Sequence, residues 1–463
     1  MTLDDLKADV ESGAIDTVLL ALTDMQGRLQ GKRLTGRHFL DSVVHHGAEA
    51  CNYLLAVDVD MNTVDGYEMS SWERGYGDFE MVPDLSTLRP VPWHEGTAMV
   101  LADLQWPDGR PVIASPRQIL RRQVERLAER GWGAIAATEL EFMVFRTPYD
   151  EAFRRAYREL EPANLYNVDY SMLGTARVEP LLRRIRNAMS AAGLEVENSK
   201  GECNFGQHEI NFRYADVLRA ADEHVIYKNG AKEIADQEGM AITYMAKFDE
   251  REGNSCHIHL SLRAQDGTAL FADEPALFDR FLAGLLATLR ELTLLLAPNI
   301  NSYKRYADAS FAPTTVAWGH DNRTCALRVV GHGDGRRVEC RVPGADVNPY
   351  LALSALIAGG LHGIDAGLEL EPPLEGNAYA SDKPRVPATL REARDLFAGS
   401  EVAREAFGAE VVEHYLNNAR IELAAFEAAV TDWERFRGFE RLRDRACADV
   451  DIRPHAAIGS SPL

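Results

Sequence analysis

Three segments of the sequence carry polar side chains two positions apart within otherwise apolar stretches. The pairs are Glu139 and Glu141 in TELEFMVF, His257 and His259 in CHIHLSL, and Glu339 and Arg341 in VECRV. In a β-strand, residues i and i+2 point to the same face, so each pair projects to one side and its apolar neighbours to the other. Carboxylates and imidazoles are costly to bury without compensation, and a divalent cation is the obvious compensation.

A fourth segment, GECNFGQHEINF, brings Glu202 and Glu209 together around a turn at Gly206. Four or five carboxylates with one or two histidines make a hard, oxygen-rich site, which favours Mg²⁺ or Mn²⁺ over a structural zinc. A solvated strand face stays an alternative for any single pair, whereas four such segments together favour a metal site. Cys203 and Cys256 are neighbours of these residues, and strand alternation predicts that both are small core residues.

A cluster of arginines is the second chemical feature. Six lie between positions 305 and 341, namely Arg305, Arg323, Arg328, Arg336, Arg337 and Arg341. Guanidinium groups bind carboxylate and phosphate through two parallel hydrogen bonds, so the cluster indicates an anionic ligand. Ordinary surface arginine is the alternative, above all for Arg336. The sequence has no GxxxxGK[ST] motif and no convincing GxGxxG motif, so any nucleotide would bind outside the P-loop and Rossmann frameworks.

The overall composition limits the possible partners. The chain has 463 residues with 50 Lys and Arg against 71 Asp and Glu, a formal net charge of −21. Such an acidic surface repels phosphate backbones, so we expect no nucleic-acid partner. The acidic N-terminus lacks a signal peptide, and the apolar stretch at 281–298 is interrupted by Arg290 and Glu291. We therefore expect a cytoplasmic protein without a membrane span.

The elements that must position these residues can be placed along the chain. Residues 16–106 alternate short apolar runs with turns and one helical segment near 37–46, which predicts a small α+β module. A helix is expected to begin at Pro116, so we place a domain boundary near 107–114. Beyond it we expect strands at 134–145, 193–202, 207–214, 256–262, 326–331 and 337–344. Helices are expected at 216–239, 276–296 and 349–367 and over most of 388–439.

These residues resemble the glutamine synthetase family over essentially the whole chain. The matching segments, in the order of the family, are TELEF, KGECNFGQHEI, GNSCHIHLSL, NSYKR, NRTCALRV, RRVECRVPGADVNPYL and VTDWER. The resemblance implies an α+β fold with an N-terminal β-grasp domain over 1–107. A catalytic domain of antiparallel strands flanked by helices would follow over 113–463. It also implies a homo-oligomer of two stacked hexameric rings, with active sites at the subunit interfaces.

The resemblance further implies a role for each motif residue. Glu141, Glu202 and Glu209 would hold a first metal, and Glu139, His257 and Glu339 a second. The ATP contacts would be Tyr214, His259, Ser261, Arg323, Arg328 and Arg337. The glutamate contacts would be Gly253, His259, Arg305, Arg323 and Arg341, with Arg305, Arg323 and Glu339 catalytic. Two or three Mg²⁺ or Mn²⁺ ions per site would assist transfer of the ATP γ-phosphoryl group to the glutamate γ-carboxylate, and an amine would then displace phosphate.

One departure from the family concerns the amine. Enzymes that use ammonium carry a glutamate directly before an Ala-Pro pair, and here Phe311 occupies that position in YADASFAP. The chain thus resembles the branch that glutamylates organic amines, and GRLQGKR and EREGNSCHIH resemble actinobacterial γ-glutamylethanolamide synthetases. Ethanolamine is the predicted acceptor, with putrescine or another polyamine as the alternative and ammonium less favoured. The expected amine contacts are Asp58, Asp60, Asp308 and Ser310, for which an ordinary polar loop residue is the alternative, together with Phe311.

Overall fold

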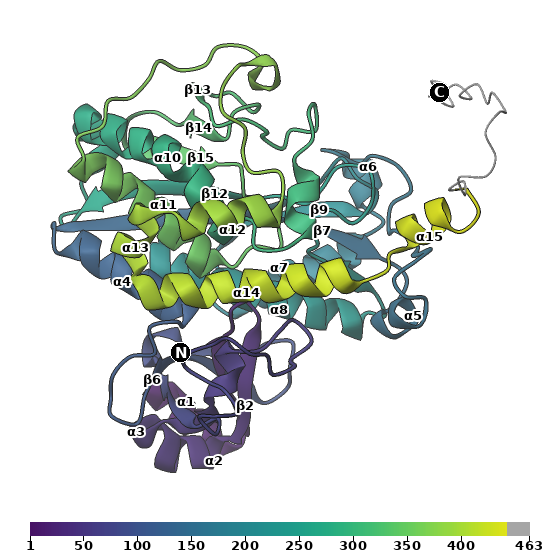
Figure 1. The fold of residues 1–463 in the computed structure, drawn as a ribbon. Coiled ribbons are helices and arrows are strands. Elements are labelled where there is room, and N and C mark those ends of the chain that lie inside the picture. Colours follow the sequence, from purple (N-terminus) through teal and green to yellow (C-terminus); the bar gives the residue numbers. More distant parts are fainter. Residues whose placement is uncertain (442–463) are drawn as a thin grey trace.

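The computed structural model describes residues 1–441, which form two β-sheets and the helices that cover them (Figure 1). The first sheet has six strands in the order β2-β1-β6-β4-β3, with β5 paired to β6. Its strands are β1 (Thr17–Thr23), β2 (Leu29–Thr35), β3 (Ala48–Cys51), β4 (Asp78–Pro83), β5 (Arg89–Pro90) and β6 (Thr97–Gln105). β1 runs parallel to β6 and the other pairs are antiparallel, so this sheet is mixed.

Short helices close one side of this sheet. They are α1 (Leu3–Ser12), α2 (Gly36–His38), η1 (Phe39–Val43), α3 (Val44–His46), η2 (Asn52–Leu55) and η3 (Leu85–Thr87). The α2–α3 stretch is the helical segment expected near 37–46. Leu6 of α1 and Phe39 of η1 are fully buried with Leu20 and Phe79 of the strands, and they form a separate small core. The N-terminal sheet therefore has its own apolar interior.

The second sheet has nine strands and carries the predicted polar pairs, except that Arg341 lies directly past the end of its strand. Its order is β13-β14-β15-β12-β7-β9-β8, and β10 and β11 also pair with β7. The strands are β7 (Trp132–Phe145), β8 (Val196–Gly201), β9 (Gln207–Phe212), β10 (Ala215–Asp216), β11 (Ala241–Thr243), β12 (Cys256–Ala264), β13 (Trp318–His320), β14 (Leu327–Val330) and β15 (Arg337–Cys340). Only β13 and β14 pair in parallel, which confirms the predicted antiparallel strands.

Helices cover one face of this sheet and leave the other to the polar side chains. The longer ones are α4 (Pro116–Ala128), α7 (Glu179–Ala191), α8 (Val217–Gln237), α10 (Pro275–Leu296), α11 (Pro349–Asp365), α12 (Leu390–Ala398) and α14 (Ala409–Ala428). The shorter ones are α5 (Tyr149–Arg154), α6 (Met172–Thr175), α9 (Leu270–Asp273), η4 (Asn301–Arg305), η5 (Gly333–Gly335), η6 (Ala378–Ala380), α13 (Glu401–Phe407) and α15 (Asp432–Gly438). α10 and α11 pack backbone to backbone, since a Cβ on Gly284 would lie 2.2 Å from the Gly359 carbonyl oxygen.

The long helix α14 runs between the two sheets, and α15 extends from the body (Figure 1). Among residues 1–441, no helix is both long and apolar enough to cross a membrane. The segment between β6 and α4 joins the two sheets, and we retain the division into domains 1–107 and 113–463 as a proposal. The end of that second range, residues 442–463, lies outside the described residues.

Candidate active site

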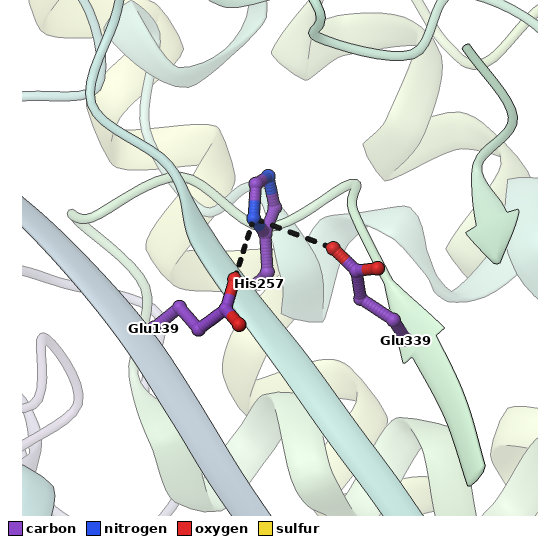
Figure 2. Close-up of side chains that lie close together, drawn as sticks. All are labelled: Glu139, His257 and Glu339. Carbon is purple, nitrogen blue, oxygen red and sulfur yellow. Dashed lines mark hydrogen bonds and ion pairs between the residues drawn. The ribbon is translucent and has the colours of Figure 1, made fainter. Parts of the chain in front are cut away.

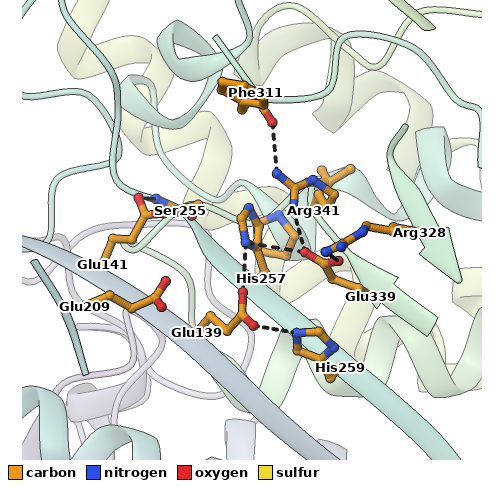
Figure 3. Close-up of polar contacts among 12 residues, drawn as sticks. Glu139, Glu141, Glu209, Ser255, His257, His259, Phe311, Arg328, Glu339 and Arg341 are labelled. Carbon is orange, nitrogen blue, oxygen red and sulfur yellow. Dashed lines mark hydrogen bonds and ion pairs between the residues drawn. The ribbon is translucent and has the colours of Figure 1, made fainter. Parts of the chain in front are cut away.

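The register of the second sheet brings predicted polar residues, together with Lys200 and Asn211, into three adjacent rows across the strands. The rows are Glu141, Glu209 and Lys200; His257, Glu139 and Asn211; and Arg328, Glu339 and His259. Side chains opposite each other on paired strands lie about 5 Å apart, so groups distant in sequence become direct neighbours. The predicted i, i+2 pairs therefore do share one face, and the rows merge them into one site (Figure 3).

Glu139, His257 and Glu339 form one candidate metal site (Figure 2). The Nδ1 of His257 lies 3.2 Å from Oε2 of Glu139 and 3.5 Å from Oε1 of Glu339. Potential ligand atoms of the three residues all lie within 4.8 Å of one another. Burial lowers the pKa of His257, which favours the neutral imidazole that binds metal. The residues predicted to hold the second metal thus converge on one point.

Glu339 is the most deeply buried of these carboxylates. It is fully buried, and it accepts hydrogen bonds from Nη1 of Arg328 at 2.8 Å and from Arg341. Burial alone would raise the pKa of Glu339, but His257 and Arg341 outweigh it and hold the pKa below its usual range. Burial would likewise raise the pKa of Glu139, yet hydrogen bonds to His257 and His259 hold it far below the ordinary value. Both carboxylates are therefore ionised.

Glu141, Glu202 and Glu209 form a second cluster whose ligand atoms also lie within 4.8 Å of one another. Glu141 is held in place by the backbone N–H of Ser255 at 2.6 Å and by Nε2 of Gln207 at 3.0 Å. Burial and the charge of Glu141 raise the pKa of Glu202 to about 8 and raise that of Glu209 well above its ordinary value. Three carboxylates that repel one another fit a divalent cation, which would relieve the repulsion.

The three carboxylates of this cluster line a cavity of about 630 Å³, and arginines line the same cavity. Arg305 is 3% exposed and donates from Nη2 to backbone carbonyls such as that of Arg341 at 2.9 Å. The Nε atoms of both Arg305 and Arg341 are buried and have no hydrogen-bond partner within residues 1–441. Buried donors without partners in a native protein require an explanation, and an anionic ligand supplies one.

Two further predicted residues lie beside these arginines. A Cβ on Gly253 would lie 2.3 Å from the Ala246 carbonyl oxygen and 2.8 Å from Cγ of Arg305, so only glycine fits there. Arg323 is exposed and lines the cavity, and it forms no hydrogen bond or ion pair with the rest of the described chain. Its guanidinium is therefore available to a ligand.

A second cavity, of about 460 Å³, adjoins the first at Glu139, which lines both. Tyr214, Ser261 and Arg337 line this cavity, as does His259. Arg337 donates from Nε to Nδ1 of His259 at 3.1 Å, and the Ser261 Oγ is buried without a partner among the described residues. The predicted ATP contacts therefore gather here, except that Arg323 and Arg328 line the first cavity.

Arg336 also lines the second cavity, but its side chain is engaged by the protein. Its guanidinium lies over the Phe278 ring, 5.3 Å from the ring centre, and Nη1 donates to the Phe271 carbonyl oxygen at 3.4 Å. Arg336 is half-buried, so it is not the ordinary surface arginine of the alternative.

The five expected amine contacts are not brought together within one chain. Ser310 and Phe311 line the larger cavity, and the Phe311 carbonyl accepts from Arg341 at 3.4 Å (Figure 3). Asp308 is exposed and binds Arg385 at 3.1 Å. Asp58 accepts from the Asn62 backbone at 2.8 Å, and neither Asp58 nor Asp60 lines either cavity. Their segment packs on α14, where Asn417 donates to the Asp65 carbonyl at 3.1 Å.

Sequence reasoning was wrong about Cys203 and did not find Lys200. Cys203 is not a core residue but half-buried, with Sγ 3.7 Å from Oδ2 of Asp169, because it follows the end of β8 and strand alternation no longer applies. Cys256 is fully buried, as predicted. Lys200 lines the larger cavity and forms an ion pair with Glu202. Its position two residues before Glu202 is the signal that could have revealed it.

Comparison with known proteins places this geometry in context. The glutamine synthetase catalytic domain model matches residues 113–437. The chain is 64% identical to γ-glutamylethanolamide synthetase GlnA4 of Streptomyces coelicolor, over 95% of this chain and 96% of that one. It is 40% identical to a glutamate–isopropylamine ligase of a Pseudomonas species, over 92% and 96%. A solved GmaS/ADP complex superposes with a TM-score of 0.83 and 27% identity, over 95% of this chain and 100% of that one. The chain therefore belongs to the glutamine synthetase family.

Proposed function

We propose that this chain is an ATP-dependent ligase that forms γ-glutamylethanolamide from L-glutamate and ethanolamine through γ-glutamyl phosphate. The observation that carries the proposal is the junction at Glu139, where a cavity lined by arginines and carboxylates meets a second cavity lined by the expected ATP contacts. Two substrates placed in these cavities would meet beside both candidate metal sites. The high identity to a γ-glutamylethanolamide synthetase supports the choice of acceptor.

The two acidic clusters fit Mg²⁺ or Mn²⁺, two or three ions per site, because every potential ligand atom is a carboxylate oxygen or an imidazole nitrogen. Glu141, Glu202 and Glu209 would hold the ion beside glutamate. Glu139, His257 and Glu339 would hold the ion beside the ATP phosphates. Such ions, when bound, neutralise phosphate charge and polarise the transferring group.

The residues of the chain divide the remaining work between substrate binding and phosphoryl transfer. Arg305 and Arg341, with Gly253 and His259, would hold the carboxylates of glutamate so that a γ-carboxylate oxygen faces the ATP γ-phosphorus. That oxygen attacks phosphorus, the bond to ADP breaks, and γ-glutamyl phosphate forms. Arg323 would stabilise the charge on the transferring group, since its guanidinium lines the cavity and has no partner within the described chain.

Further residues would contact the ATP phosphates and support the second step. Arg328, Arg337, Tyr214 and Ser261 would complete the ATP site. A neutral amine nitrogen then attacks the acyl carbon of γ-glutamyl phosphate, the C–O bond to phosphate breaks, and the amine gives up its proton. Glu339 would position Arg328 and Arg341 during both steps, because it binds each of them.

We assign the acceptor to organic amines because Phe311 replaces a carboxylate with an aromatic side chain at the cavity. Phe311 is 58% exposed, so its ring is free to pack against an alkyl chain. Putrescine or another polyamine is the second candidate, and ammonium is third. A non-catalytic paralogue is a further candidate, against which the complete metal and arginine sets argue.

We also propose the family's assembly of two stacked hexameric rings and a cytoplasmic location. Asp58 and Asp60 lie outside both cavities of their own chain, so they would reach an acceptor site only from a neighbouring subunit. Exposed apolar side chains support contacts between subunits, for example those of Met172 at 86% and Trp433 at 68% exposure.

An amine-panel assay of phosphate release tests the function. With ATP, Mg²⁺ and glutamate, we expect turnover with ethanolamine and little with ammonium chloride. Phosphate release that needs no glutamate, or vigorous turnover with ammonium and none with ethanolamine, would overturn the proposal. The absence of amine-dependent turnover in any arm, together with an unchanged rate in Glu339→Ala, would favour the non-catalytic paralogue.

A further inference from the structure

Lys200 is a fixed cation inside the acidic cavity, and the proposed ligase mechanism gives it no role. It lies on β8, the edge strand of the second sheet, in the same row as Glu209 and Glu141. Only 23% of its side chain is exposed. Partial burial of a lysine charge is costly, and here the charge lies where the ligand of the cavity is expected. A role in keeping the surface soluble does not account for this position.

Three groups hold the Lys200 ammonium in place. It forms an ion pair with Glu202 and lies 3.7 Å from Oδ1 of Asp169. It also lies over the ring of Tyr170, 4.6 Å from the ring centre, which is cation–π distance. If Glu202 turns toward a metal ion, Asp169 and the Tyr170 ring still hold the ammonium. The ammonium therefore stays at this wall of the cavity, with Asp169 as its remaining ion-pair partner.

Two strained aromatic residues line the cavity together with Lys200. Tyr170 has φ 55° and Phe311 has φ 57°, and both are in the left-handed region that residues other than glycine rarely adopt. They are 70% and 58% exposed. Such strain persists where the surroundings impose it, and it concentrates at ligand sites. The two rings provide apolar walls for an alkyl chain, and Lys200 provides the charge.

We propose that Lys200 determines acceptor specificity by admitting amines whose tail is uncharged and rejecting amines whose tail carries a second ammonium. The inference rests on the proposed ligase function and narrows its substrate class. The attacking nitrogen must be neutral when it reacts, whereas the second ammonium of a diamine keeps its charge in the cavity. A hydroxyl tail is compatible with Lys200 and Asp169, while an ammonium tail meets a like charge at short range.

Matched substrate pairs that differ only in the tail group test this inference. The pairs are ethanolamine with ethylenediamine and 4-aminobutan-1-ol with putrescine, each measured as kcat/KM in the phosphate-release assay. In the wild type we expect the hydroxyl member of each pair to be preferred. Lys200→Met removes the charge and keeps the length, so the hydroxyl-to-ammonium ratio should fall about ten- to a hundredfold, as expected for two charges about 6–8 Å apart. Lys200→Arg keeps the charge and should keep the ratio.

A second variant should raise the hydroxyl-to-ammonium ratio. Asp169→Asn removes a partner of Lys200 and leaves more net positive charge, so discrimination against ammonium tails should increase. A wild-type ratio in Lys200→Met, or a wild-type preference for the diamines, overturns the inference. If Lys200→Met is inactive with every amine, an unchanged ratio in Asp169→Asn overturns it instead. Failure of the ligase function itself is seen separately, as wild-type protein that releases no phosphate with any amine.

Discussion

Two buried carboxylates of the candidate active site, Glu339 and Glu209, should change the stability of the metal-free protein in opposite directions when each is replaced by glutamine. Glu339 lies between cations, with Nη1 of Arg328 at 2.8 Å and Arg341 on its other oxygen. Glu209 is buried and lies beside the like charge of Glu141. Both effects raise the pKa of Glu209 well above its ordinary value. Without metal, the fold thus favours the charge of Glu339 and disfavours that of Glu209.

The magnitudes follow from these contacts. Glu339→Gln leaves two guanidiniums facing a neutral amide, and removal of one partner from a buried ion pair costs about 3–5 kcal/mol. Glu209→Gln replaces a carboxyl whose charged form the metal-free fold disfavours, so its effect lies between zero and about 1 kcal/mol of stabilisation. Saturation of one metal site with Mg²⁺ or Mn²⁺ at a hundred times Kd should stabilise the wild type by about 2.7 kcal/mol, and each variant should lose most of the gain from the site to which its residue belongs.

The assay is thermal unfolding of the EDTA-treated proteins at one scan rate, followed by repeats over a metal titration. A chain with two cores need not unfold in one step, so the variants are compared with the wild type under identical conditions. Glu339→Gln should unfold well below the wild type, and Glu209→Gln at or above it. The reasoning is refuted if Glu209→Gln lowers the metal-free unfolding temperature as far as Glu339→Gln does.

Three further predictions concern the acceptor, the metal and the phosphate. Phe311→Glu should gain ammonium-dependent turnover and lose about tenfold in kcat/KM for ethanolamine, whereas Phe311→Leu should keep its preference; equal ammonium rates in both variants would contradict this. The pKa of Glu202 is raised from 4.5 to about 8, so its protonated form stabilises the metal-free fold fully below pH 4.5, and this contribution is lost as pH rises toward about 8. Calorimetry should therefore show proton release on Mn²⁺ binding and affinity that increases from about pH 6 to about pH 9; pH-independent affinity would argue against it. Arg323→Ala should lower kcat about a hundred- to a thousandfold with the fold intact by circular dichroism, and Arg323→Lys should lose less; a wild-type rate in the alanine variant would exclude the phosphate role.

Local patterns in the sequence predicted the elements and the faces of the strands. The helix expected at 276–296 is observed at Pro275–Leu296, and the strand expected at 256–262 is observed at Cys256–Ala264. The period-2 pattern also placed Glu139 and Glu141 on one face, because alternation is a property of a single strand. The helices α5–α7 between 149 and 191 were not predicted.

The register between strands and the contacts between distant loops could not be predicted from the sequence. That Glu339 pairs with Arg328 across β14 and β15 depends on long-range strand pairing, which no local pattern specifies. The same holds for Lys200, whose partner Asp169 comes from a loop outside the predicted elements. Asp58 and Asp60 were assigned by resemblance. Their segment packs on α14, and this position depends on how the N-terminal sheet docks on the rest of the chain.

The position of Lys200 on an edge strand and of Phe311 in a loop has a consequence for how new enzymes could arise from this scaffold. Five of the six proposed metal ligands lie on the inner strands β7, β9, β12 and β15, where a substitution disturbs neighbours on both sides. Edge strands and loops tolerate change far better. Acceptor preference can therefore diverge, by natural drift or by design, while the costly phosphorylation machinery is inherited intact.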